Sequence, residues 1–95
     1  MKLRFTRQAL RDLVEIANYL REQNPDAAIR VRNSIIDALR RLTDFPQLGR
    51  IQNVEGVRKY VTRRFSYLVY YTIEEDRIVV LSLRHPSRRR EYIDS

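Results

Sequence analysis

The first half of the chain carries apolar residues at a helical period. Lys2–Phe5 alternates polar and apolar residues and predicts a short strand. Thr6 then begins a helix, because its hydroxyl is placed to accept a hydrogen bond from an early backbone N–H. Apolar residues recur every three or four positions afterwards, which predicts a helix over about residues 7–23, with its stripe formed by Ala9, Leu10, Leu13, Ile16, Ala17 and Leu20.

A second amphipathic segment follows almost at once. Asn24 and Pro25 end the first helix and begin another, since asparagine caps helices and proline suits the first turn. Two outward pairs in this segment, Asp26–Arg30 and Asp37–Arg41, have the spacing of helical ion pairs. So short a break predicts a helical hairpin. The apolar stripe of the second helix is formed by Ala28, Val31, Ile35, Leu39 and Leu42.

The second half changes to the alternation typical of strands. After a loop over residues 43–50, we expect strands at about 57–62, 67–73 and 77–84, with Glu74–Asp76 as the turn between the last two. The order β-α-α-β-β-β predicts an α+β fold, in which the helical hairpin packs on one face of a small, mostly antiparallel sheet. The length fits a single domain over residues 1–95.

Both faces of the expected sheet are apolar, although two helices cover only one of them. One face of the strand at 67–73 carries Tyr67, Val69, Tyr71 and Ile73, and the other carries Leu68 and Tyr70. In the last strand the alternation sets Ile78 and Val80 against Val79, Leu81 and Leu83. The second face is therefore expected to be covered either by loops, the tail or another copy, or by a partner protein.

The charge is strongly positive and comes almost entirely from arginine. There are 19 basic and 12 acidic side chains, a net charge of +7, and only Lys2 and Lys59 of the basic ones are lysines. Arginine makes bidentate contacts with phosphate and carboxylate. The excess indicates a solvated basic surface, a nucleic-acid partner or an acidic protein partner.

The composition excludes several kinds of site. With no cysteine, one histidine and two glycines, the chain has no disulfide, no thiolate metal site, too few nitrogen ligands for a zinc hydrolase and no P-loop or Rossmann turn. We therefore expect no metal and no cofactor. The longest aliphatic run, residues 78–81, is too short to span a membrane, and we expect a cytoplasmic protein without membrane association.

Five segments, in order along nearly the whole chain, resemble the RelE/ParE superfamily of bacterial type II toxins. Thr6–Leu13 resembles the family's T-x-x-A-x-x-D-L entry to the first helix, and Phe45–Arg50 contains P-x-x-G-R. The remaining three are G-x-R at Gly56–Arg58, Y-x-(I/V)-x-Y at Tyr67–Tyr71, and a closing I-x-I-L-x-(I/V)-x-H-x-x-R at Ile78–Arg88.

The resemblance implies a toxin that is neutralised by a small antitoxin from the same operon, whose carboxy-terminal segment wraps the toxin. Such an acidic segment would explain both the second apolar face and the basic surface. On this interpretation the antitoxin contacts Tyr67, Val69, Tyr71 and Ile73. The alternative is that the tyrosines of this strand are sheet-packing residues.

The superfamily contains two activities, and the residues favour one of them. ParE-like members poison DNA gyrase without a catalytic site of their own, and here the target-binding residues would be Arg84, His85, Arg88 and Arg89. RelE-like members are endoribonucleases that cut mRNA on the ribosome, with candidate catalytic residues Arg58, Arg64, His85, Arg88 and Tyr92.

Two positions where the RelE-like pattern expects cations are Tyr60 and Tyr67, so the sequence favours the ParE-like activity. The RelE-like activity is the alternative, and a basic nucleic-acid-binding or interaction module is a lesser one. The individual residues also have structural interpretations. His85 could be a sheet-end histidine bonded to a backbone carbonyl, Arg58 and Arg50 could tie loops in place, and Arg88–Arg90 could be a solvated tail.

Overall fold

The computed structural model describes residues 1–87. Its elements are β1 (Lys2–Phe5), α1 (Arg7–Gln23), α2 (Pro25–Asp44), a short 3₁₀ helix η1 (Pro46–Leu48), β2 (Arg50–Ile51), β3 (Val57–Val61), β4 (Leu68–Glu74) and β5 (Arg77–Arg84). This order confirms the predicted α+β fold. It adds a two-residue strand, β2, at the end of the predicted loop, where Arg50 and Ile51 pair antiparallel with Lys59 and Arg58.

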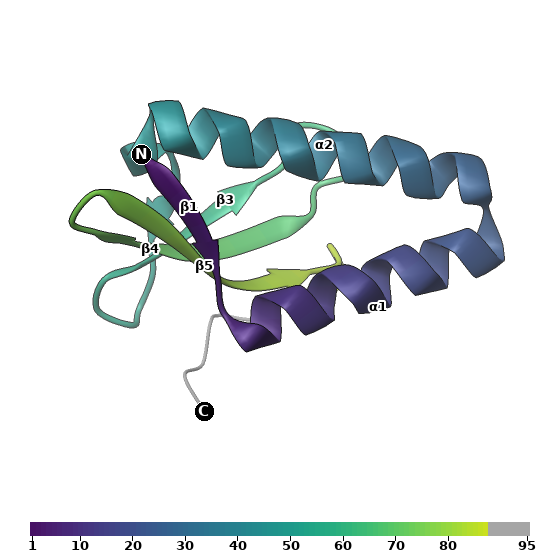
Figure 1. The fold of residues 1–95 in the computed structure, drawn as a ribbon, viewed down its shortest axis with the longest axis horizontal. Coiled ribbons are helices and arrows are strands. Elements are labelled where there is room, and N and C mark those ends of the chain that lie inside the picture. The colour runs from purple at the N-terminus through teal and green to yellow at the C-terminus, as the bar shows by residue number, and fades with distance from the viewer. Residues whose placement is uncertain (88–95) are drawn as a thin grey trace.

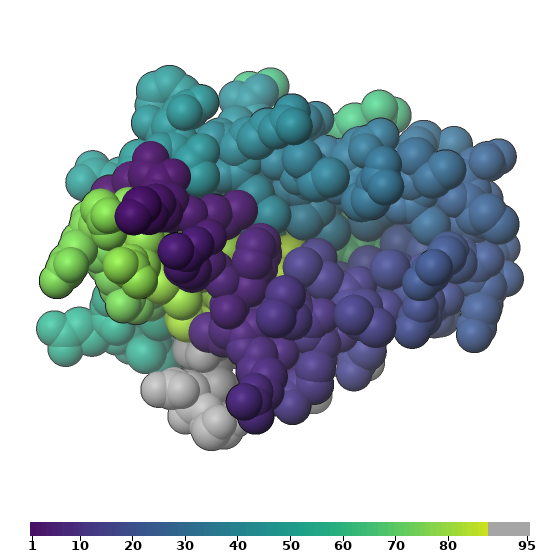
Figure 2. Space-filling model, in the orientation of Figure 1, coloured from purple at the N-terminus to yellow at the C-terminus, as the bar shows by residue number. Residues whose placement is uncertain are grey.

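The five strands form one sheet in the order β1-β5-β4-β3-β2. Within residues 1–87 only the β1–β5 pair is parallel, which confirms the mostly antiparallel sheet. The two helices lie side by side in front of the sheet, and their connected end extends beyond the strands (Figure 1). The space-filling view of this face shows the helices with little of the sheet visible between them (Figure 2).

Both helices begin at the predicted residues. The Thr6 hydroxyl accepts a hydrogen bond from the Ala9 amide at 3.1 Å, and the Asn24 side chain accepts from the amides of Asp26 and Ala27 at 3.1 and 3.2 Å. Each bond satisfies an amide that has no partner within its helix. Asn24 also ends α1, because its own amide bonds to the Leu20 carbonyl at 2.7 Å.

The main core lies between the helices and one face of the sheet, and it corrects one prediction. Tyr67, Val69 and Tyr71 are buried in this core beneath the helices, and Ile73 packs at its edge. The prediction that these four share a face is confirmed, but the interpretation of that face as uncovered is wrong. An alternating pattern separates the two faces of a strand without indicating which one the helices cover.

The opposite face has a smaller core of its own. Leu68 and Tyr70 are buried there together with Val57, and Val54 from the loop before β3 packs against them. Leu81 joins this second core. At these positions the second face is therefore covered as well.

A β-bulge in β5 overturns the predicted alternation of the last strand. Tyr70 pairs with Ser82 and Tyr71 with Val80, so Leu81 is an extra residue. The bulge reverses which way the following side chains point, and Leu83 lies with Ile78 and Val80 in the main core instead of opposite them.

Candidate functional site

The bulge at the end of β5 is held by α1. The Asp12 carboxylate accepts hydrogen bonds from the Leu83 amide at 2.9 Å and from the Ser82 hydroxyl at 3.1 Å. The Thr6 hydroxyl donates to the Leu81 carbonyl at 2.9 Å. These bonds satisfy backbone groups that the extra residue removes from the regular ladder. They give the T-x-x-A-x-x-D-L segment a structural role, in which the fully buried Ala9 packs between its two polar residues against the sheet.

The same bonds position Arg84, the last residue of β5. Its Nε donates to the Ser82 hydroxyl at 3.3 Å, which in turn donates to Asp12. Its guanidinium lies 5.1 Å from the centre of the Tyr70 ring, a cation–π distance. A chain of contacts from α1 through β5 therefore fixes a partly exposed arginine at this end of the sheet.

His85 follows at the surface. Its Nδ1 accepts a hydrogen bond from the Ser87 amide at 3.0 Å and lies 2.8 Å from the Ser87 hydroxyl. The neutral ring therefore carries its proton on Nε2. The ring also meets Tyr67 edge-on at 5.4 Å between centroids. The structural interpretation of His85 as a sheet-end residue agrees with this geometry, except that its backbone partner is an amide and not a carbonyl.

Arg58 ties a loop to the sheet. Its Nη1 donates to the carbonyls of Gly49 at 2.9 Å and Gln47 at 3.2 Å. The neighbouring Tyr71 hydroxyl donates to the Pro46 carbonyl at 2.6 Å and accepts from the Gly49 amide at 2.9 Å. A Cβ at Gly49 would lie 2.7 Å from the Tyr71 ring, so this close approach requires glycine. The P-x-x-G-R and G-x-R segments thus meet in one cluster of hydrogen bonds that attaches the loop to the sheet.

Arg64 lies in the turn between β3 and β4. Its carbonyl accepts hydrogen bonds from the hydroxyls of Thr62 at 2.7 Å and of Ser34, on α2, at 2.9 Å. Its guanidinium lies 5.6 Å from the centre of the Phe65 ring. The side chain therefore projects from the surface of a turn that is fixed through its backbone.

Among the ribonuclease candidates that the structure describes, Arg58 lies apart from His85. Arg58 lies opposite Tyr71 in the ladder, whereas Arg84, next to His85, lies opposite Leu68, three residues away on β4. That separation is about 10 Å along the sheet. Arg58 is also occupied by two loop carbonyls. Two further ribonuclease candidates, Arg88 and Tyr92, lie outside the described residues, as does Arg89 of the predicted target-binding set.

The residues assigned to antitoxin contact are also placed differently from the prediction. Tyr67 is 4% exposed, and Val69 and Tyr71 are fully buried under the helices. A partner could reach them only by opening the main core, so the assignment of these three side chains to an open binding face is wrong. Ile73, which is partly buried at the edge, keeps some accessible surface.

Burial changes the acidity of three tyrosines. It raises the pKa of Tyr67, Tyr70 and Tyr71 above the ordinary value of 10.0. For Tyr71 the hydrogen bond from Gly49 and the charge of Arg58 oppose the rise without cancelling it. The Tyr71 hydroxyl is thus protonated near neutral pH, as its role as a donor to Pro46 requires.

Two kinds of site are not found in the described part of the chain. Within residues 1–87, no three histidine, cysteine or acidic side chains gather closely enough to hold a metal ion. In the same range, neither helix has a stretch long and apolar enough to cross a membrane.

The sequence did not predict that the side chains of Asp12 and Tyr71 connect distant elements through hydrogen bonds. Asp12 is an acidic residue on the half-buried side of an amphipathic helix, and this placement was the available signal, since a carboxylate there needs donors from the sheet. Tyr71 carried no comparable signal. Its partners lie 22 and 25 residues earlier in the chain, and only the fold brings them together.

Comparisons with known proteins agree with this architecture. Residues 3–90 match the family model described as the ParE toxin of the type II toxin–antitoxin system parDE. A protein of Sinorhizobium fredii (strain NBRC 101917 / NGR234) named Putative toxin Y4kP is 34% identical over 84 residues, covering 88% of this chain and 86% of that protein.

Two solved structures share the fold. A chain of the chromosomal ParDE system from P. aeruginosa superposes with a TM-score of 0.78 at 24% identity, covering 90% of this chain and 95% of that one. A chain of the E. coli RelBE toxin–antitoxin complex gives a TM-score of 0.64 at 18% identity, covering 92% and 98%. Because the family model matches residues 3–90, nearly the whole of this chain, the chain belongs to the ParE toxin family of type II toxin–antitoxin systems.

Proposed function

We propose that this toxin arrests growth by binding DNA gyrase and holding its cleaved complex with DNA, and that an antitoxin encoded beside it neutralises the toxin. The observation that carries the proposal is the position of Arg58. A ribonuclease of the RelE type needs its cations free to stabilise charge at the scissile phosphate. Arg58 instead donates to the carbonyls of Gly49 and Gln47.

Two further observations support a binding role. The matched family model is the ParE one. Arg84 is fixed by Ser82 and Tyr70 at the end of the sheet, where it presents a positioned charge to a partner surface. The ParDE and RelBE systems that share the fold are toxin–antitoxin systems, which supports the antitoxin partner. On this proposal the protein acts in the cytoplasm, where gyrase and DNA are located.

Induced expression in a bacterial host tests the proposal. We expect growth arrest, a DNA-damage response and cleaved gyrase–DNA complexes recovered after detergent lysis, all suppressed when the neighbouring gene is co-expressed. The variant Tyr92→Phe should arrest growth as the parent does, because no phenolic proton transfer is needed for binding. Cuts in ribosome-bound mRNA that disappear in Tyr92→Phe would overturn the proposal in favour of the ribonuclease activity.

A further inference from the structure

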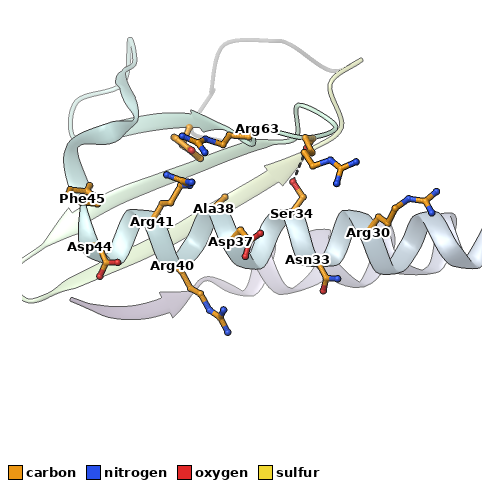
Figure 3. A pocket seen from close by; sticks show the side chains of 12 residues that line it. Arg30, Asn33, Ser34, Asp37, Ala38, Arg40, Arg41, Asp44, Phe45 and Arg63 are labelled. Atoms are coloured by element: carbon orange, nitrogen blue, oxygen red, sulfur yellow. Dashed lines mark hydrogen bonds between the residues drawn. The ribbon is translucent and has the colours of Figure 1, made fainter.

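A groove of about 620 Å³ runs between α2 and the β3–β4 end of the sheet. Its lining includes neither Arg84 nor His85. Five arginines, two aspartates and two aromatic residues line it, among them Arg41, Arg63, Arg64, Phe45 and Tyr60. The side chains of Arg41, on α2, and Arg63, after β3, extend toward each other across the groove (Figure 3).

Among the described residues, none of these five arginines forms an ion pair, and they outnumber the two aspartates that also line the groove. Within residues 1–87, the ion pairs of the structure both involve Asp76, at the far turn between β4 and β5. The predicted pair Asp37–Arg41 is therefore wrong, and so is Asp26–Arg30. Facing guanidinium groups that are not ion-paired attract an anion into the space between them.

The wall formed by residues 62–67 is fixed in an unusual conformation. Phe65 and Ser66 both have positive φ, 68° and 55°. Such a backbone is costly for a bulky residue and persists only where surrounding contacts hold it. Here the contacts are the hydrogen bonds that Ser34 and Thr62 donate to the Arg64 carbonyl, and the bond from the Tyr67 amide to Thr62. They use no arginine side chain, so Arg63 and Arg64 stay on the surface as binding groups.

Aromatic rings lie beside the charges. Phe45, at the end of α2, is 63% exposed, although a phenylalanine gains by burial. Tyr60 lines the groove from β3, and Phe65 is 38% exposed on the adjoining turn. Arginines that contact a sugar–phosphate backbone, interleaved with rings on which unpaired bases stack, are the features by which proteins hold single-stranded nucleic acid.

We propose that this groove binds a short segment of single-stranded DNA, with Arg41, Arg63 and Arg64 on the phosphates and Phe45 and Tyr60 against the bases. An acidic peptide would match the charge, but it would leave the exposed Phe45 ring without a stacking partner. The inference rests on the proposed function only in choosing DNA over RNA. Binding is measured on the isolated chain without gyrase, so its failure is distinguishable from failure of the gyrase proposal.

The test is fluorescence anisotropy of a labelled oligothymidylate of about 12 nucleotides. The purified full chain is compared with the triple variant Arg41→Gln, Arg63→Gln, Arg64→Gln. We expect the variant to lose at least about tenfold in affinity. The slope of log K against log salt, measured between about 50 and 200 mM, should fall by about 2, since each phosphate contact to a single strand contributes about 0.7.

A second triple variant, Arg7→Gln, Arg11→Gln, Arg21→Gln, removes the same charge from exposed positions on α1 and serves as the matched control. It should lose much less affinity. Phe45→Leu, which keeps an apolar side chain but removes the ring, should weaken binding about fivefold or more. Thermal unfolding verifies that all variants remain folded.

Three results would overturn the inference. Equal losses in the two triple variants would reduce the binding to general charge attraction. Tighter binding of oligouridylate than of oligothymidylate would contradict the choice of DNA. Tighter binding of a glutamate-rich peptide, weakened by the groove variant, would make this surface a protein-docking site.

Discussion

At the scale of single residues, the family-typical segments of this chain mainly hold loops and strands together through hydrogen bonds. Tyr71 has its ring in the main core, while its hydroxyl bonds to both ends of the η1 turn. Arg58 reaches the same turn with its guanidinium. The two side chains lie opposite each other on neighbouring strands, so the loop is attached to the centre of the sheet.

We predict that Tyr71→Phe lowers the free energy of unfolding by about 1–3 kcal/mol, because it leaves the buried Gly49 amide and the Pro46 carbonyl without their partner. Tyr60→Phe is the control. The structure gives the Tyr60 hydroxyl no hydrogen bond within residues 1–87, and its loss should cost less than about 0.5 kcal/mol. Urea unfolding measures the stability of both variants. Equal losses would contradict the stabilising role of the Tyr71 hydroxyl.

The buried tyrosines also predict a loss of stability at high pH. Their pKa values are raised in the folded state, so the native protein holds these protons more tightly than the unfolded chain does. The resulting stabilisation is complete below the unfolded pKa of about 10 and is lost as the pH rises through the folded values. Urea unfolding between about pH 8 and 11 should show this decline, with a smaller slope in Tyr71→Phe. A slope unchanged in that variant would contradict the assignment to Tyr71.

At the scale of elements, the contact between α1 and β5 depends on polar groups as well as apolar ones. The Asp12 carboxylate accepts hydrogen bonds from the Leu83 amide and the Ser82 hydroxyl at the bulge. The Thr6 hydroxyl both caps α1 and donates to the Leu81 carbonyl. The helix therefore begins where the strand departs from its ladder. The same bonds fix the direction of Arg84.

Asp12→Ala is expected to destabilise the fold by about 2–3 kcal/mol, since it removes a charged acceptor from two donors that are at least partly buried. Glu15→Ala, an exposed acid on the same helix, should change stability by less than about 0.5 kcal/mol. Chemical denaturation compares the two variants. A similar loss in both would mean that the carboxylate acts only through the charge of the helix.

At the scale of the whole molecule, the +7 charge is concentrated on arginines that the fold leaves at its surface. Two such surfaces carry arginines: the end of β5, with Arg84, and the groove between α2 and the β3–β4 turn, whose lining does not include Arg84. We assign the first to the protein target and the second to single-stranded DNA. A gyrase–DNA complex would offer both kinds of partner.

Arg84→Gln should weaken growth arrest, because it removes a positioned charge from the proposed target surface while the bulge keeps its bond to Asp12. Arg21→Gln, which removes an exposed charge from α1, should arrest growth as the parent does. Growth curves after matched induction, with protein levels checked by immunoblot, measure the difference. Full toxicity of Arg84→Gln would place the target contact elsewhere.

The sequence by itself determined the elements of this protein and their order. Helix caps at Thr6 and Asn24 and the helical period are local properties, readable from residues a few positions apart. The alternation over residues 67–71 likewise separated Tyr67, Val69 and Tyr71 from Leu68 and Tyr70. The ordered family-typical segments then indicated the superfamily.

Tertiary structure decided which face of the sheet the helices cover, because alternation is symmetric between the two faces. It also decided where Leu83 points, since the bulge at Leu81 depends on the pairing partner and on Asp12, 71 residues away from Leu83. For the same reason the Arg58 guanidinium is bound to loop carbonyls and is not a free cation. The loop that supplies these carbonyls is brought to Arg58 only by the folded sheet. The groove between Arg41 and Arg63 likewise exists only once α2 packs beside β3.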